Sequence, residues 1–139
     1  MDVAFGSDLP IGAGLSSSAA LEMATARALC AASGLPWDPR AMARACQRAE
    51  NQFVGVNCGI MDQFASAAAE EGCALLLDCR SLETRLTSIP ANAIVVIMDT
   101  GARRSLAGSA YNERRASCEK AVAALAKISV APFNVSTSW

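Results

Sequence analysis

The sequence has 139 residues, of which 53% are hydrophobic and 18% are charged, and its formal net charge is −1. This composition excludes a disordered tail and fits one domain with a buried core, while the weak net charge and the 5% of aromatic residues argue against a nucleic-acid-binding surface. No apolar run is long enough to span a membrane and no signal peptide is recognisable, so we expect a cytoplasmic protein that does not bind membranes.

The first third of the chain predicts a short strand, a glycine-rich loop and a long helix. Apolar side chains alternate along residues 3–5, as they do in a strand. The loop at 10–20 leads into a helix predicted over residues 16–33, and Gly34 is a suitable helix stop. Only two of the helical residues are charged, so we expect most of the surface of this helix to be buried.

A second helix is predicted from its start signal. Asp38 is a typical N-cap, and Pro39 suits the first helical position. We expect this helix to end at Gly55 and a short third helix to follow over residues 60–69. The apolar face of the second helix is predicted from side chains at steps of three and four, namely Met42, Cys46, Ala49 and Phe53.

The second half mixes strands and a helix. Strands are predicted at 73–78, at 84–89 as an edge strand, and at 93–98 as a strand covered on both faces. A last helix is predicted over 109–127, and the tail at 131–139 shows no periodicity. Helices and strands that do not alternate strictly indicate an α+β fold. The inner side of the last helix is expected to carry Tyr111, Cys118, Val122 and Leu125.

The loop at 10–20 combines two glycines and three serines at the entrance of a helix. Glycine lets a ligand approach the main chain closely, and the free N–H groups of a helix N-terminus bind anions. The segment therefore has the makings of a phosphate cradle, although it lacks the lysine of a Walker A loop. Most glycine-rich turns before helices bind nothing, so an ordinary turn is the alternative.

Two carboxylates stand out because histidine is absent from the whole chain. Acid–base chemistry then depends on other side chains, and no imidazole-assisted nucleophile is available. Glu50 and Asp62 flank a loop of small residues, and such a pair suits phosphoryl transfer, one carboxylate holding Mg²⁺ and the other orienting the attacking hydroxyl. The alternatives are a solvated helix-end charge for Glu50 and a helix-capping residue for Asp62.

Residues 99–115 follow the predicted buried strand and contain four arginines and the only tyrosine. They could line a site for an anionic or polar ligand. For the arginines we favour a charged helix face, with Arg115 paired to Glu119. Tyr111 is expected on the inward face, where its hydroxyl needs a partner.

The six cysteines show no zinc-binding spacing. We expect reduced thiols rather than disulfides, because Cys30, Cys46 and Cys118 fall on apolar helix positions.

Three segments together resemble the galactokinases, a branch of the GHMP family of small-molecule kinases. Residues 10–20 look like the phosphate-binding motif P-x-G-x-G-L-x-S-S-A of the whole family. Residues 50–63, which end in Cys-Gly-Ile-Met-Asp-Gln, and residues 103–115, which are similar to R-x-S-L-A-x-S-x-Y-x-x-R-R, are close to specific for galactokinases. The resemblance covers residues 1 to about 127.

The resemblance implies an α+β fold with a GHMP-kinase N-terminal-type domain (ribosomal protein S5 domain 2-like). The nucleotide-binding domain would occupy residues 1–90, and the start of the C-terminal domain would occupy 91–139, both incomplete. Two family motifs have no match in this chain: G-R-x-N-x-I-G-E-H-x-D-Y, and a glycine-rich motif near the C-terminus. We therefore expect these residues alone to be inactive.

The implied reaction is ATP-dependent phosphorylation of galactose at its anomeric hydroxyl, with Mg²⁺ as the metal. Asp62 would act as the catalytic base or orienting carboxylate, and Gly59, Asp62 and Tyr111 would contact the sugar. Ser18 and Glu50 would lie around Mg²⁺. The intact enzyme is expected to be a monomer. The nucleotide phosphates would be held by Pro10, Gly12, Ala13, Gly14, Leu15, Ser16, Ser17 and Ser18.

Two other functions fit the same residues. One is a GHMP kinase that acts on another sugar or small alcohol. The other is a non-catalytic sensor of sugar and ATP derived from a kinase.

Overall fold

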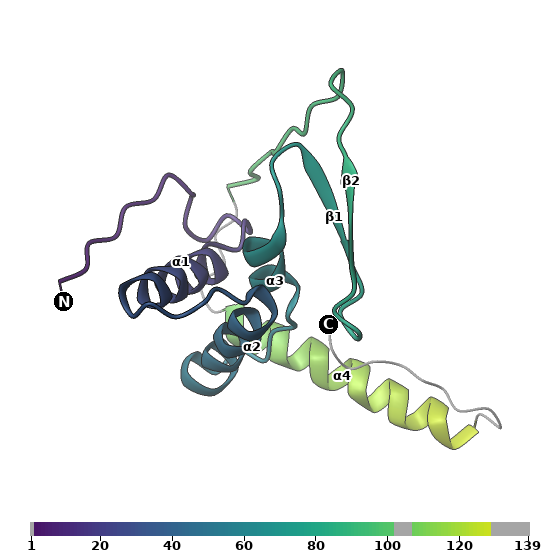
Figure 1. The fold of residues 1–139 in the computed structure, drawn as a ribbon. Coiled ribbons are helices and arrows are strands. Elements are labelled where there is room, and N and C mark those ends of the chain that lie inside the picture. The colour runs from purple at the N-terminus through teal and green to yellow at the C-terminus, as the bar shows by residue number, and fades with distance from the viewer. Residues whose placement is uncertain (1, 102–106, 129–139) are drawn as a thin grey trace.

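Three helices at the centre of the molecule carry most of its buried side chains, and a hairpin and a fourth helix extend from them (Figure 1). The computed structural model describes residues 2–101 and 107–128. Its mixture of helices and a small sheet confirms the α+β prediction. In chain order the elements are α1 (Ser17–Ala32), α2 (Pro39–Ala49), the π-helix η1 (Glu50–Val54), α3 (Met61–Ala68), β1 (Cys73–Leu77), β2 (Thr84–Ser88) and α4 (Ala107–Ile128).

Local signals set the junction between α1 and α2 as predicted. Gly34 has a φ of 65° after the end of α1, and the Leu35 N–H donates to the Cys30 carbonyl at 2.9 Å. This six-to-one bond is the Schellman arrangement that glycine favours. The Asp38 carboxylate then accepts hydrogen bonds from the backbone N–H groups of Arg40 and Ala41, at 2.9 and 3.1 Å, and so caps α2.

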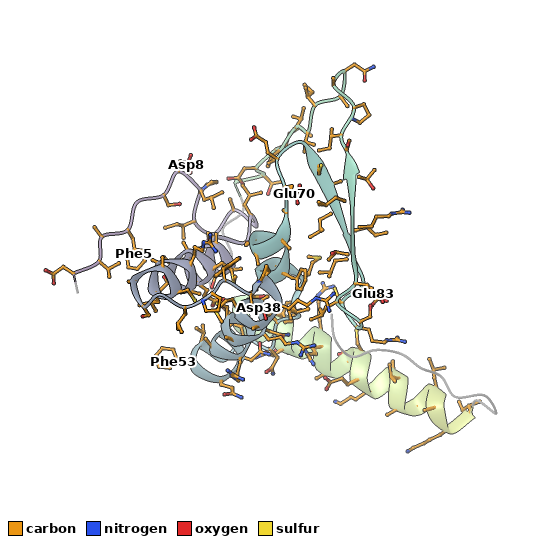
Figure 2. All side chains as sticks on the ribbon, viewed as in Figure 1. Phe5, Asp8, Asp38, Phe53, Glu70 and Glu83 are labelled. Carbon is orange, nitrogen blue, oxygen red and sulfur yellow. The ribbon has the colours of Figure 1, made fainter. Side chains whose placement is uncertain are left out.

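The helix that begins at Pro39 changes its pitch before it ends. After α2 the chain continues as η1 and stops at Gly55, whose N–H donates to the Glu50 carbonyl at 2.9 Å. Within this π-helix the angular step between successive residues is smaller than in an α-helix, so its side chains leave the α-helical pattern. Phe53 is therefore 93% exposed and points away from the helices (Figure 2).

The predicted apolar face of α2 is consequently only half right. Cys46 is buried and Met42 is partly buried, but Ala49 and Phe53 are exposed. Beside Cys46, the buried residues of this face are Ala43 and Glu50. They follow helical spacing, but one of them is a carboxylate, which an apolar pattern does not include.

The core lies where α2 and α3 meet the hairpin. Ala43, Ile60, Phe64 and Leu82 are its buried residues, and Leu75 and Leu77 of β1 pack against them. Helix α1 packs on α2 and α3 by one face, with Ala19, Met23 and Cys30 buried. The expectation that most of α1 is buried is wrong, because its other face meets no element of the described chain.

The sheet is a two-stranded antiparallel hairpin in which Leu75 of β1 is paired with Leu86 of β2. The two strands expected around 73–78 and 84–89 are thereby confirmed. The strands expected at 3–5 and 93–98 are wrong: neither segment forms regular structure, and Phe5 and Ile94 are 63% and 86% exposed. An extended segment becomes a strand only when its N–H and C=O groups pair with a neighbour, and within the described residues β1 and β2 pair only with each other.

Leu82 lies in the turn of this hairpin and packs in the core. Asp78 Oδ1 accepts the N–H groups of Arg80 and Ser81 at 2.7 and 3.2 Å, and these bonds lower the pKa of its carboxyl. Leu82 follows with a φ of 58°, in the left-handed region that L-residues rarely adopt. Its 2% exposure shows that the core compensates for this strained backbone.

Helix α4 runs away from the body and contacts it near its first turns (Figure 1). The helix is confirmed, but its expected inner side is mostly wrong: Tyr111 is 39% exposed, Cys118 is exposed, Leu125 is 48% exposed, and only Val122 is partly buried. The tail at 131–139 lies outside the described residues. Among the described helices, none combines the length and apolar character needed to cross a membrane.

Candidate active site

The glycine-rich loop takes the backbone shape that its composition predicts. Gly12 and Gly14 have φ values of 74° and 79°, which glycine adopts without steric cost. Ser16, the N-cap of α1, is also left-handed with a φ of 55°, a conformation that costs an L-residue about 1–2 kcal/mol. Its side chain makes no cap hydrogen bond, so it leaves the first N–H groups of α1 for another acceptor. A strained, uncapped helix start of this kind suits an anion.

Ser18 and Glu50 lie in direct contact, although 32 positions separate them in the sequence. Ser18 Oγ donates to Glu50 Oε2 at 2.6 Å. Glu50 is only 8% exposed, so it is not a solvated charge at a helix end. The first turn of α1 supplies the hydroxyl, and the junction of α2 and η1 supplies the carboxylate. Hydroxyl and carboxylate oxygens are hard ligands of the type that Mg²⁺ prefers, and Mg²⁺ usually needs only one or two protein carboxylates beside phosphate oxygens.

Glu22 joins this pair and was not expected in the site. It lies one helical turn after Ser18, and its carboxyl group is hydrogen-bonded to that of Glu50. Burial, followed by this hydrogen bond, raises the pKa of Glu22 to about 7. The two carboxyl groups also repel each other when both are charged, which acts in the same direction. The spacing of four residues from Ser18 could have indicated Glu22, since residues so spaced share a helix face.

Gln63 connects the carboxylates to the loop before α3. It is 2% exposed, and its Nε2 donates to Glu22 Oε2 at 3.2 Å and to Cys58 Sγ at 3.7 Å. Cys58 Sγ in turn donates to Asn51 Oδ1 at 3.3 Å. Burial raises the pKa of the Cys58 thiol above its ordinary value, which keeps the proton that this bond needs. Within the described residues, Gln63 Oε1 is buried and accepts no hydrogen bond.

Asp62 precedes Gln63 and lies in the first turn of α3, partly buried. It is not the capping residue of this helix, because Ile60 occupies the N-cap position. A carboxylate in the first turn is favoured by the helix dipole. In the sequence, Asp62 directly precedes the buried Gln63 and lies three residues after Gly59.

Helix α4 reaches the other end of the same loop. The Gly59 N–H donates to the Tyr111 hydroxyl oxygen at 3.3 Å, so the structure brings these two predicted residues together. Arg115 Nε pairs with Glu119 Oε1 at 3.0 Å, as expected, but its Nη1 also donates to the Asn57 carbonyl at 3.0 Å. The charged-face interpretation of Arg115 is thus incomplete. The predicted arginines at 103 and 104 lie outside the described residues.

Hydrogen bonds join four of the predicted residues in two pairs, Ser18 with Glu50 and Gly59 with Tyr111, and residues that were not predicted lie between the pairs. From Ser18 they run through Glu50, Glu22 and Gln63 to Cys58, whose neighbour Gly59 contacts Tyr111. In residues 2–101 and 107–128, no three Asp, Glu, Cys or His side chains gather as a self-sufficient metal cage. The arrangement suits a metal that brings further ligands with it, as Mg²⁺ does with nucleotide phosphates. All six cysteines are free thiols, as expected; Cys30 and Cys46 are buried, but Cys118 is exposed.

The chain is similar to known proteins over most of its length. Residues 1–70 match the family model of the GHMP kinases N terminal domain. The chain is 51% identical over 121 residues to the galactokinase of Chloroflexus aurantiacus, an alignment that covers 87% of this chain and 31% of that protein. It also superposes on the crystal structure of Lactococcus lactis galactokinase complexed with galactose, with a TM-score of 0.76 and 31% identity over 90% of this chain and 32% of that one. The chain thus spans about a third of the length of these relatives.

Proposed function

Because the chain belongs to the GHMP kinases, we propose that it is a segment of a galactokinase, which transfers the γ-phosphoryl group of ATP to the anomeric hydroxyl of galactose. The product is α-D-galactose 1-phosphate. The observation that carries this proposal is the 2.6 Å contact between Ser18 and Glu50 beside an uncapped helix N-terminus. It puts a hydroxyl, a carboxylate and unpaired N–H groups in one place, as phosphoryl transfer requires.

In this proposal the loop from Pro10 to Ser18 holds the nucleotide phosphates. Its two left-handed glycines allow the phosphates to approach the main chain closely, and the helix dipole stabilises negative charge at the N-terminus of α1. Ser18 and Glu50 would hold Mg²⁺, whose charge offsets that of the transferred phosphoryl group. Glu22, which is partly buried, supports Glu50 through their shared hydrogen bond.

Asp62 acts on the sugar. Its carboxylate lies in the first turn of α3, and it can accept the proton of the attacking hydroxyl or orient that hydroxyl. A loose transition state makes little demand on prior deprotonation, so a carboxylate of low basicity is adequate. Gly59 and Tyr111 would contact the sugar, and the hydrogen bond between them supports this pairing.

The domain assignment follows the same proposal. Residues 1–90 would form part of the nucleotide-binding domain, and residues 91–139 would begin the second domain. The exposed, irregular stretch from Asn92 to Gly101 between the hairpin and α4 is consistent with a connection of this kind. The six free thiols fit a reducing cytoplasm. We expect the intact enzyme to be a monomer.

The test is ATP-dependent phosphorylation of galactose by the full-length protein that contains this chain, beside an Asp62→Asn variant. We expect turnover with galactose and its loss in the variant, which keeps the shape of the side chain but not its charge. Turnover with another sugar or alcohol, and none with galactose, would identify a different GHMP kinase. Binding of galactose without turnover would identify a sensor instead.

A further inference from the structure

We propose that Asn112 and Arg115 of α4 are positioning residues, which hold the backbone of residues 55–59 in the shape that presents Gly59 and Asp62 to the sugar. This inference rests on the proposed function. Neither side chain was expected to have this role, and neither needs to touch the substrate to fulfil it.

Asn112 makes two hydrogen bonds to the backbone of the loop. Its Nδ2 donates to the Gly55 carbonyl at 3.1 Å, and its Oδ1 accepts the Asn57 N–H at 2.9 Å. A primary amide carries one donor group and one acceptor beside each other, so it matches a carbonyl and an N–H two residues apart along a backbone. Only one orientation of the amide can form both bonds, because a flipped amide would place its N–H group against the Asn57 N–H and its oxygen against the Gly55 carbonyl.

Arg115, one turn further along α4, adds a third hydrogen bond to the backbone of the loop. Its Nη1 donates to the Asn57 carbonyl at 3.0 Å, while its Nε is held by Glu119 Oε1 at 3.0 Å. Both backbone groups of Asn57 are therefore bound by α4. With the Tyr111 hydroxyl on the Gly59 N–H, the helix contacts alternate residues of the loop at 55, 57 and 59. We call Asn112 and Arg115 together the α4 clamp.

The α4 clamp acts on the exposed part of the loop, since Gly59 is buried and Cys58 is already held by hydrogen bonds with the body. Gly55 and Asn57 are exposed, and Gly55 has a φ of 86° directly after the π-turn. In the described part of the chain, α4 packs against no other helix or strand, so polar contacts with this loop connect it to the body. The loop runs straight into α3, whose first turn holds Asp62. Its backbone shape therefore sets the position of the two sugar-site residues at its end.

The experiment uses the full-length protein that contains this chain and compares Asn112→Ala, Asn112→Asp, Arg115→Ala and Arg115→Lys. Asn112→Asp keeps the acceptor for Asn57 but sets a charged oxygen against the Gly55 carbonyl, and Arg115→Lys keeps a cationic donor. Glu113→Ala is the matched control, since Glu113 is exposed on the same helix and no contact with the loop involves its side chain. The readouts are the KM for galactose, the KM for ATP and kcat.

We expect Asn112→Ala to raise the KM for galactose about tenfold, the effect of losing two modest hydrogen bonds, with the KM for ATP unchanged. Asn112→Asp should raise the KM for galactose as well, because its charged oxygen repels the Gly55 carbonyl, and Arg115→Lys should recover part of the loss in Arg115→Ala. An unchanged galactose KM in both Asn112 variants, or equal rises in both KM values, would overturn the proposal.

Hydrogen exchange separates this inference from the proposed function. In Asn112→Ala the amides of Asn57 and Gly59 should exchange faster than in the wild type, while those of α1 should not change. Unchanged exchange at these amides would refute the clamp even in an active enzyme. If the wild type does not phosphorylate galactose, the proposed function fails, and the exchange rates still decide whether α4 holds the loop.

Discussion

Ser18 Oγ donates a 2.6 Å hydrogen bond to Glu50 Oε2, across the junction between the start of α1 and the end of α2. The contact places a hydroxyl on the exposed side and a carboxylate on the buried side of one small site. Glu50 also interacts with the carboxyl group of Glu22, and this interaction contributes to the raised pKa of Glu22.

Replacing Glu50 with glutamine should lower kcat of the full-length enzyme about a hundredfold and raise its requirement for Mg²⁺, because an amide oxygen is a weaker ligand than a carboxylate. The check is a titration of activity with Mg²⁺ at saturating ATP and galactose. Glu70→Gln is the control, since Glu70 is exposed after the end of α3. An Mg²⁺ dependence that matches the wild type would show that Glu50 is not a ligand.

Glu22 should make the metal-free protein less stable as the pH rises. Its pKa is raised from 4.5 to about 7 in the fold, so the folded state holds the proton more tightly than the unfolded chain does. Its contribution to stability is therefore fully present below pH 4.5 and is lost as the pH rises through about 7. In the presence of a chelator, Glu22→Gln should lose this dependence. The melting temperature of the variant minus that of the wild type should therefore increase from pH 5 to pH 8.

The control for this measurement is again Glu70→Gln, whose difference from the wild type should stay constant over the same pH range. A constant difference for Glu22→Gln as well would mean that its carboxyl titrates normally in the fold.

The cap of α2 provides a prediction independent of the site. Asp38→Ala removes the acceptor of two backbone N–H groups and should lower the free energy of unfolding by about 1 kcal/mol. Asp38→Asn keeps a side-chain acceptor and should restore most of that loss. Urea unfolding measures both, and equal destabilisation by the two substitutions would show that the cap hydrogen bonds contribute little.

The helices could be predicted from the sequence because their signals are local. Asp38 followed by Pro39 marks one start and Gly34 marks one end, and the structure has both. Strands depend on partners, so the same reasoning failed at residues 93–98: an apolar run predicts burial, but Ile94 is 86% exposed where no described strand pairs with it. Phe53 was misplaced for another reason, since a π-turn shifts the helical period without a mark in the sequence.

The candidate site was predicted unevenly. Resemblance to a family suggested Ser18, Glu50 and Tyr111, whereas spacing alone gave only a weak argument for any of them. Glu22 was overlooked because a lone acidic residue in an alanine-rich helix reads as a solvated side chain. Asn112 was overlooked because its partners are backbone groups 55 and 57 positions away, and no side-chain pattern records such contacts.

Gln63 offers a test of the buried side of the site. Gln63→Leu removes the amide that donates to Glu22 and should cost about 1–3 kcal/mol of unfolding free energy, because a partly buried acceptor then loses its partner. Gln63→Glu should cost more, and increasingly so from pH 6 to pH 8, since it sets a third carboxyl group beside Glu22 and Glu50. Gln52→Glu is the matched control, because Gln52 is exposed on η1, and it should change stability by less than about 0.5 kcal/mol. Urea unfolding at the two pH values measures all three variants. If the loss in Gln63→Glu were the same at both, the carboxylates would not interact through this position.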